Sequence, residues 1–186
     1  MTNKTNTYVL LAAGTAGGFL LGRVLPVVLA NVSGLMQGAV GRDPFARLIE
    51  QHRTLLSLLD KMEQLPSEDW AKRRVSFLAF KRTIGKHVMA EEDIVYPLLK
   101  TEAERHEATQ KLYREHASMK IHLFELEKAI HSRDEWGDAV RALRSEIGPH
   151  AREEEETEFP RLRELLDQKR AAELMRKILQ EEALVV

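Results

Sequence analysis

One motif occurs twice in this chain, and it limits the folds that the chain can adopt. The two copies are residues 84–97, IGKHVMAEEDIVYP, and residues 147–160, IGPHAREEEETEFP. In each copy a glutamate follows a histidine by four residues, so the two side chains share one face of a helix. Apolar residues recur on that face at helical spacing. Both copies are therefore predicted to point a histidine and a carboxylate into a helical core.

The rest of the sequence also carries helix signals. Start signals occur at Asp43-Pro44, at Ser67, in Thr101-x-x-Glu104 and in Ser132-x-x-Glu135. They predict four long helices, over residues 43–64, 67–99, 101–131 and 134–166. No segment alternates with the period of two that a half-buried strand requires. Short connections make neighbouring helices antiparallel, so the predicted fold is all-α, an up-down-up-down antiparallel four-helix bundle.

Each predicted helix carries one histidine on its apolar stripe. These histidines are His52, His87, His116 and His150. A single core histidine is usually a hydrogen-bonded packing residue, but one on each of the long helices is harder to explain by packing. Glu91 and Glu154 follow the same stripes inward, and a buried carboxylate without a partner costs several kcal/mol. Two divalent cations would satisfy both carboxylates and all of these imidazoles together.

The predicted metal ligands are therefore His52, His87, Glu91, His116, His150 and Glu154. Mixed imidazole and carboxylate ligands favour iron or manganese, and ligand type alone leaves zinc open. The chain has no cysteine, which excludes a thiolate zinc site, a cysteine nucleophile and a cysteine-ligated iron–sulfur cluster. With 28 Lys and Arg against 29 Asp and Glu, the overall charge gives no reason to expect nucleic acid as a partner.

The glycines and the internal proline of the motif are predicted to shape its helices. Gly85 and Gly148 lie beside the inward histidines, where a missing side chain lets a neighbouring helix approach. Pro149 removes one backbone hydrogen bond, so a kink or bulge is predicted beside His150.

Residues 8–30 form an apolar stretch interrupted by Arg23 and one proline. As a helix it would be about 35 Å long, enough to cross a bilayer core of roughly 30 Å. We predict that it anchors the chain in a membrane, with the basic residues that follow it holding the bundle in the cytoplasm. Its glycines would also permit a homo-oligomeric helix contact. Two alternatives stay open: a signal peptide cleaved near Ala30, which leaves a soluble or exported protein, and a helix docked against a partner.

The predicted organisation has four parts. They are an N-terminal apolar segment at residues 1–30, a glycine-rich linker at residues 31–42, the four-helix bundle at residues 43–166 and a short amphipathic helix within residues 167–186. Apolar residues of the last helix are predicted to cover one end of the bundle.

The order of the six predicted ligands resembles the hemerythrin-like family, the HHE cation-binding domain. That family has a histidine, a His-x-x-x-Glu pair, a second histidine and a second His-x-x-x-Glu pair on four antiparallel helices, and residues 43–166 are similar to it throughout. The resemblance implies a centre of two non-haem iron ions, oxo- or hydroxo-bridged and also bridged by both carboxylates. It further implies binding or sensing of dioxygen, nitric oxide, peroxide or iron itself.

The chain departs from two branches of that family. Oxygen-carrying hemerythrins have a His-x-x-x-His pair on the third helix and an aspartate as the last ligand. In this chain the residues four positions before and after His116 are Leu112 and Lys120, and the last predicted ligand is Glu154. The iron–sulfur repair branch has a cysteine-containing N-terminal segment, which this chain lacks. Reversible oxygen carriage and cluster repair are therefore not expected.

Two other functions are kept as alternatives to a binding or sensing protein. One is a di-iron oxidoreductase that decomposes peroxide or oxidises ferrous iron, and the other is a metal-free helical scaffold tethered to a membrane. Tyr113, one turn before His116, is a candidate for an additional phenolate ligand, and simple packing is its alternative role.

Overall fold

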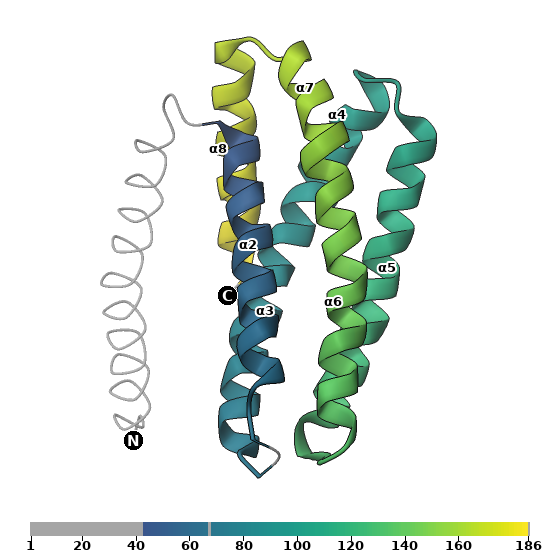
Figure 1. Cartoon of the computed structure of the whole chain (residues 1–186). Coiled ribbons are helices and arrows are strands. Elements are labelled where there is room, and N and C mark those ends of the chain that lie inside the picture. Colours follow the sequence, from purple (N-terminus) through teal and green to yellow (C-terminus); the bar gives the residue numbers. More distant parts are fainter. Residues whose placement is uncertain (1–42, 67, 186) are drawn as a thin grey trace, which may run out of the picture. The chain divides into compact units, whose positions relative to one another are not determined.

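The computed structural model describes residues 43–66 and 68–185 of the chain. Throughout these residues the elements are helices, with no strand (Figure 1), which confirms the predicted all-α class. The predicted anchor at residues 8–30, the linker and the start signal at Ser67 lie outside the described residues. Within residues 43–66 and 68–185, no helix has the length and apolar character needed to span a bilayer.

The described chain consists of long helical stretches followed by a shorter helix. The elements are α2 (Pro44–Glu63), α3 (Trp70–Ala90), the π-helical turn η1 (Glu91–Val95), α4 (Tyr96–Thr101), α5 (His106–Lys128), the 3-10 turn η2 (Ala129–His131), α6 (Glu135–Glu153), the π-helical turn η3 (Glu154–Glu158), α7 (Phe159–Leu165) and α8 (Gln168–Leu184). Helix α2 packs against α3 and α6, α5 packs against α6, and α8 packs on α3 and α2. Figure 1 shows α2, α3, α5 and α6 side by side.

Two of the predicted helix starts are confirmed. The Asp43 carboxylate accepts a hydrogen bond from the Phe45 N–H at 3.0 Å, with Pro44 as the first residue of α2. The Ser132 hydroxyl accepts from the Glu135 N–H at 3.2 Å. Both side chains satisfy a backbone donor that the first helical turn leaves without a partner.

The capping box predicted from Thr101 and Glu104 is wrong. Thr101 is the last residue of α4, and Glu104 has a left-handed backbone with φ of 53°. The Arg105 N–H reaches back to the Leu99 carbonyl at 3.1 Å, which closes the end of α4 as a left-handed C-terminal residue typically does. Helix α5 therefore begins only at His106.

A polar layer divides the core into two apolar clusters. One cluster includes Leu55, Phe77, Phe80, Met119 and Ile147, and the other includes Leu48, Val95, Leu112, Phe159 and Ile178. Along every long helix the inward histidine lies between residues of the two clusters. Packed apolar side chains therefore flank the histidines on both sides and separate them from water.

Trp136 is expected to be a major contributor to folding stability. Its ring is 1% exposed, and its Nε1–H donates to the Met62 carbonyl at 2.8 Å. The change Trp136→Ala should lower the free energy of unfolding by about 3–5 kcal/mol, because it leaves a cavity and an unpaired buried carbonyl. Urea denaturation measures this loss. The control Trp70→Ala removes a ring that is 55% exposed, so an equal loss there would contradict the expectation.

Candidate metal centre

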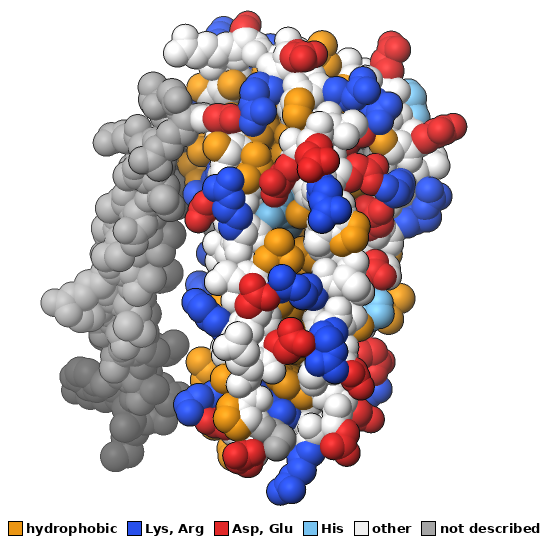
Figure 2. Space-filling model, viewed as in Figure 1, with side chains coloured by type: hydrophobic (Ala, Val, Ile, Leu, Met, Phe, Trp, Pro, Cys, Tyr) orange, Lys and Arg blue, Asp and Glu red, His pale blue; other side chains and the backbone are white. Residues whose placement is uncertain are grey.

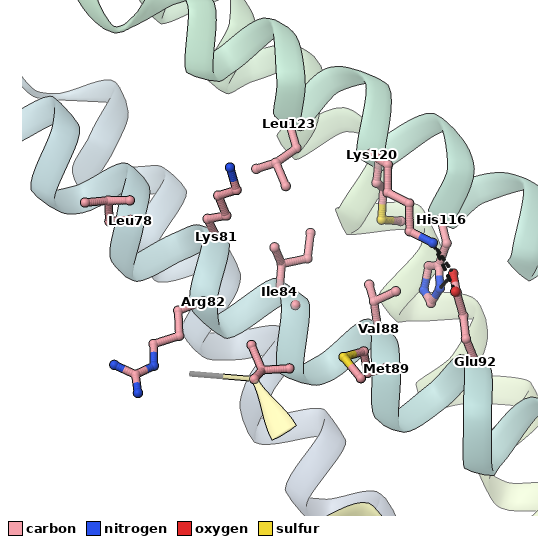
Figure 3. A pocket seen from close by; sticks show the side chains of 13 residues that line it. Leu78, Lys81, Arg82, Ile84, Val88, Met89, Glu92, His116, Lys120 and Leu123 are labelled. Carbon is pink, nitrogen blue, oxygen red and sulfur yellow. Dashed lines mark hydrogen bonds and ion pairs between the residues drawn. The ribbon is translucent and has the colours of Figure 1, made fainter. Parts of the chain in front are cut away.

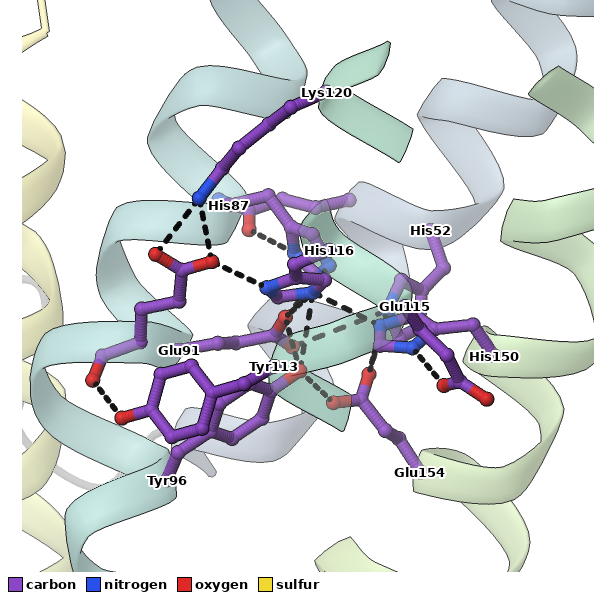
Figure 4. A network of polar contacts seen from close by, with 12 residues as sticks. His52, His87, Glu91, Tyr96, Tyr113, Glu115, His116, Lys120, His150 and Glu154 are labelled. Atoms are coloured by element: carbon purple, nitrogen blue, oxygen red, sulfur yellow. Dashed lines mark hydrogen bonds and ion pairs between the residues drawn. The ribbon is translucent and has the colours of Figure 1, made fainter. Parts of the chain in front are cut away.

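The six predicted ligand residues lie in one buried layer (Figure 4). Five of them offer ligand atoms that all lie within 4.8 Å of one another: His52, His87, Glu91, His150 and Glu154. His116 lies beside this set, with its Nε2 3.1 Å from His150 Nε2 and 3.4 Å from Glu91 Oε2. None of the six residues is more than 3% exposed. Residues far apart in the sequence thus meet at one place in the core.

The histidines form two pairs with the carboxylates between them. Ring centroids are 4.5 Å apart in the pair His52–His87 and 4.7 Å apart in the pair His116–His150. A Glu91 oxygen lies 3.1 Å from His87 Nε2 and 3.4 Å from His116 Nε2. Glu154 Oε2 lies 3.2 Å from His52 Nε2 and 3.3 Å from His150 Nε2. Each carboxylate therefore contacts one histidine from each pair.

Four polar atoms at this centre have no hydrogen-bond partner among the described residues. They are His52 Nε2, His87 Nε2, Glu91 Oε1 and Glu154 Oε2. His52 Nε2 and Glu154 Oε2 are close to each other, but they are not aligned for a hydrogen bond. Buried polar atoms without partners are uncommon and cost about 1–3 kcal/mol each. A cation between the two carboxylates would satisfy all of them, so this donor set fits a metal ion.

Each inward-facing histidine has a hydrogen-bond partner at its other ring nitrogen. The partners of Nδ1 are Glu155 for His52 at 2.9 Å, Gln51 for His87 at 3.1 Å, Glu92 for His116 at 3.1 Å and Glu115 for His150 at 2.9 Å. Such partners fix the ring orientation and leave Nε2 free to bind a metal. Helical spacing did not indicate these acceptors, although each is the chain neighbour of a predicted ligand.

The two His-x-x-x-Glu histidines have pKa values shifted in opposite directions. Burial opposes the charged form of His150, but the Glu154 carboxylate and the hydrogen bond with Glu115 raise its pKa to about 10. Burial lowers the pKa of His87, whose Nδ1 faces the neutral amide oxygen of Gln51. His87 therefore gives up a proton more readily than His150, and in its neutral form Nδ1–H donates to the amide and the Nε2 lone pair is directed at the centre.

The histidines in turn keep both central carboxylates ionised. Burial alone would raise the pKa of Glu91, but its contacts with His87 and His116 hold that pKa well below its usual value. Burial and the charge of Glu91 also oppose ionisation of Glu154, yet its contacts with His150 and a second histidine lower its pKa. Protons on the histidines thus balance the carboxylates, and a metal ion must displace those protons when it binds.

Both central glutamates begin a π-helical turn. The Tyr96 N–H donates to the Glu91 carbonyl, and the Phe159 N–H donates to the Glu154 carbonyl, so residues five apart are stacked on one face. After each turn comes one aromatic residue and then a proline, Pro97 or Pro160, which has no N–H to continue the α-helical ladder. Of the kink or bulge predicted beside His150, the bulge lies elsewhere, because Pro149 is inside α6 and the wider turn begins at Glu154; the kink stays a prediction.

Tyr96 is a site residue that the sequence analysis missed. Its hydroxyl lies 2.7 Å from Glu154 Oε1, 3.1 Å from His116 Nε2 and 3.4 Å from Glu91 Oε2 (Figure 4). Burial and the nearby carboxylates raise the pKa of Tyr96 well above its usual value. The hydroxyl therefore keeps its proton and donates to the carboxylates. The signal for it was the tyrosine at the aromatic position of the first motif copy, where the second has Phe159.

Tyr113 lies outside the centre and supports one of the π-helical turns. Its ring is edge-on to Tyr96 at 5.1 Å, and its hydroxyl donates to the Glu92 carbonyl at 2.7 Å. The Glu92 carbonyl lacks a backbone donor, because the Tyr96 N–H donates to the Glu91 carbonyl instead and Pro97 has no N–H. Of the two roles considered for Tyr113, packing is therefore the one observed, and not that of a phenolate ligand. Lys120 also lies outside the centre, paired with the Glu92 carboxylate.

Helix α8 is linked to the centre by buried hydrogen bonds. Glu182 is 4% exposed, and its carboxylate accepts from Gln51 Nε2 at 2.7 Å and from Arg47 Nε at 2.7 Å. These bonds turn the amide oxygen of Gln51 toward His87. Leu174 and its apolar neighbours on α8 are buried, and α8 packs on α3 and α2; that this helix covers one end of a bundle stays a prediction. The polar link was not predicted.

The fold and the site define a class: an all-helical protein with a buried histidine and glutamate cluster able to bind metal. A family model described as the hemerythrin HHE cation binding domain matches residues 43–162. The chain belongs to this family, so it is a hemerythrin-like protein whose cluster suits iron. No curated protein and no solved structure is similar enough to the chain to count as a match.

Proposed function

We propose that this protein is a non-haem di-iron protein that binds or senses dioxygen, nitric oxide, peroxide or iron itself. The observation that carries the proposal is the set of unpaired buried atoms directed at one centre between two histidine pairs. In this proposal His52 and His87 hold one iron, and His116 and His150 hold the other. Both central glutamates bridge the ions, and the antiparallel bundle of residues 43–166 is the framework.

Bound iron would supply coordination positions open to small ligands and one-electron redox chemistry. The chain's own residues prepare the centre for this. The Nδ1 acceptors keep the imidazoles directed inward, and the two apolar clusters keep water out. Tyr96 holds a proton beside both carboxylates. The sequence shows no nucleotide fingerprint or phosphate loop, which favours small ligands over an organic substrate.

Protein expressed with iron and purified without a histidine tag is expected to contain two iron ions per chain. Elemental analysis by mass spectrometry measures this directly. Finding no bound transition metal would contradict the proposal, and finding manganese or zinc in place of iron would correct the identity of the metal.

A di-iron oxidoreductase is the second candidate, favoured by the protonated Tyr96 hydroxyl at the centre. Ferrous-loaded protein mixed with excess peroxide or dioxygen should react about once per site if it binds or senses, since nothing then regenerates it. An enzyme would turn over many times. Sustained turnover that is lost in Glu154→Ala, with helix content retained, would replace the sensing function by peroxide decomposition or ferrous oxidation.

We also propose that residues 8–30 anchor the protein in a membrane with the bundle in the cytoplasm. Support comes from the basic residues that follow this segment, Arg42, Arg47, Arg53 and Lys61, against Lys4 alone before it. The full chain is expected in the membrane fraction, where glycine-mediated oligomers can be tested by cross-linking. A mature protein that begins at Asn31, or complete recovery in the soluble fraction, would contradict the anchor.

A further inference from the structure

A pocket of about 500 Å³ lies between α3 and α5, where these two helices pack less closely than the other neighbouring pairs. Its walls are mainly apolar: Leu78, Ile84, Val88, Met89, Met119 and Leu123 (Figure 3). The volume falls in the range of roughly 300–1,000 Å³ that small-molecule sites occupy. The pocket is therefore large enough for an organic molecule, whereas the proposed function needs space only for a diatomic or peroxide ligand.

The two ends of the pocket differ in burial. His116, which is fully buried, forms part of one end together with Glu92 and Lys120. Leu78 lines the other end and is 52% exposed. Figure 3 shows Leu78 and Arg82 at the end opposite to Glu92 and His116. A molecule that fills the pocket thus has one end in the core and one end at the surface.

The charges around the pocket favour an anion at the exposed end. Beside the buried His116, the Lys120 side chain is itself 56% exposed, and its Nζ lies 2.8 and 3.0 Å from the two oxygens of Glu92, so those charges neutralise each other. At the exposed end, Lys81 is shared with Glu127 at 2.8 Å on the surface. Arg82 has no hydrogen bond or ion pair with any residue in the described part of the chain. Where the pocket opens, Arg82 is therefore available to a ligand, and Lys81 can share its charge between Glu127 and a ligand.

We propose that this pocket binds a single-chain amphipathic carboxylate, such as a medium-chain fatty acid. The acyl chain lies between α3 and α5 and ends beside His116, and the carboxylate lies at Lys81 and Arg82. Burial of the acyl chain supplies the affinity, because each methylene removed from water favours binding. The cations at the opening select a charged head group over a neutral one.

The test uses the full-length protein and a decanoate that carries a diazirine at the end of its acyl chain. Ultraviolet irradiation followed by mass spectrometry should locate the label on residues 84–92 or 116–123, and unmodified decanoate should compete with it. Decanol has the same chain without the charge, and it should compete at least about threefold less well. Labelling elsewhere, or equal competition by decanol, would overturn the proposal.

A matched pair of variants tests the position of the ligand's acyl chain in the pocket. A Cβ added at Gly85 meets only Val185, at 3.5 Å, so Gly85→Leu extends into the pocket without backbone strain. It should reduce competable labelling about tenfold or more. Ala79→Leu adds the same side chain to an exposed position of α3 outside the pocket and should leave labelling unchanged. Equal labelling in both variants, or equal loss in both, would contradict the proposed site. The labelling should be measured both with and without bound metal, so that a failure of this proposal can be distinguished from a failure of the iron proposal.

Discussion

Replacing His87 and Glu91 together with leucine is expected to remove the stabilisation that iron gives to the folded protein. A metal that binds only the native state stabilises it by about 2.7 kcal/mol at a free concentration of 100 times Kd, and by about 4.1 kcal/mol at 1,000 times Kd. Both residues lie at the centre with unpaired buried atoms. The variant should therefore melt at a lower temperature than the wild-type protein when iron is present.

A metal-free scaffold predicts the opposite sign for the same change. Replacing buried polar groups by apolar side chains of similar volume is often neutral or stabilises a fold by about 1–4 kcal/mol. Thermal melts with and without a chelator separate the two cases. If the centre binds metal, chelator lowers the melting temperature of the wild-type protein and leaves that of the variant unchanged. The control His106→Leu alters an exposed histidine and should respond to chelator as the wild-type protein does.

Glu182→Ala is expected to weaken metal binding even though Glu182 lies on α8, outside the centre. Without its carboxylate the Gln51 amide is free to rotate, and its oxygen no longer holds the Nδ1–H of His87. Loss of such outer hydrogen bonds typically costs 10–100-fold in metal affinity. Competition with a chelator of known affinity measures the change.

Two further variants distinguish positioning of His87 from general loss of structure. Glu182→Gln keeps an oxygen that can accept from Gln51, so it should recover most of the affinity while still lacking the ion pair with Arg47. Glu181→Ala changes the adjacent acidic residue of α8 and should bind metal like the wild-type protein. Equal affinity in Glu182→Ala and Glu181→Ala would show that α8 does not position the ligand.

The sequence predicted the helices and the six inward residues because both depend on local spacing. A histidine on a 3.6-residue stripe of apolar side chains is buried whatever the helix packs against. The resemblance to the HHE family then supplied the expected partners of each histidine. Helix starts at Asp43 and Ser132 were also predictable, since each cap is a contact between residues two or three apart.

Other features depend on contacts or backbone geometry that spacing does not reveal. Tyr96 reaches the carboxylates only because a π-helical turn stacks it over Glu91, whereas α-helical spacing would direct it elsewhere. The hydrogen bond from Gln51 to Glu182 joins residues 131 positions apart, so no local pattern indicates it. Local spacing predicts a capping role for Glu104, but its left-handed backbone ends the preceding helix.

The two π-helical turns bear on how an ion reaches a centre that packed side chains seal from water. In each turn the regular ladder of backbone hydrogen bonds is interrupted beside a central glutamate, at η1 and at η3. Local opening of a helix needs least free energy where its backbone bonds are already fewest. The helices can therefore part at Glu91 or Glu154 while their ends stay folded. Metal uptake would then be limited by the rate of this local opening, not by unfolding of the whole bundle.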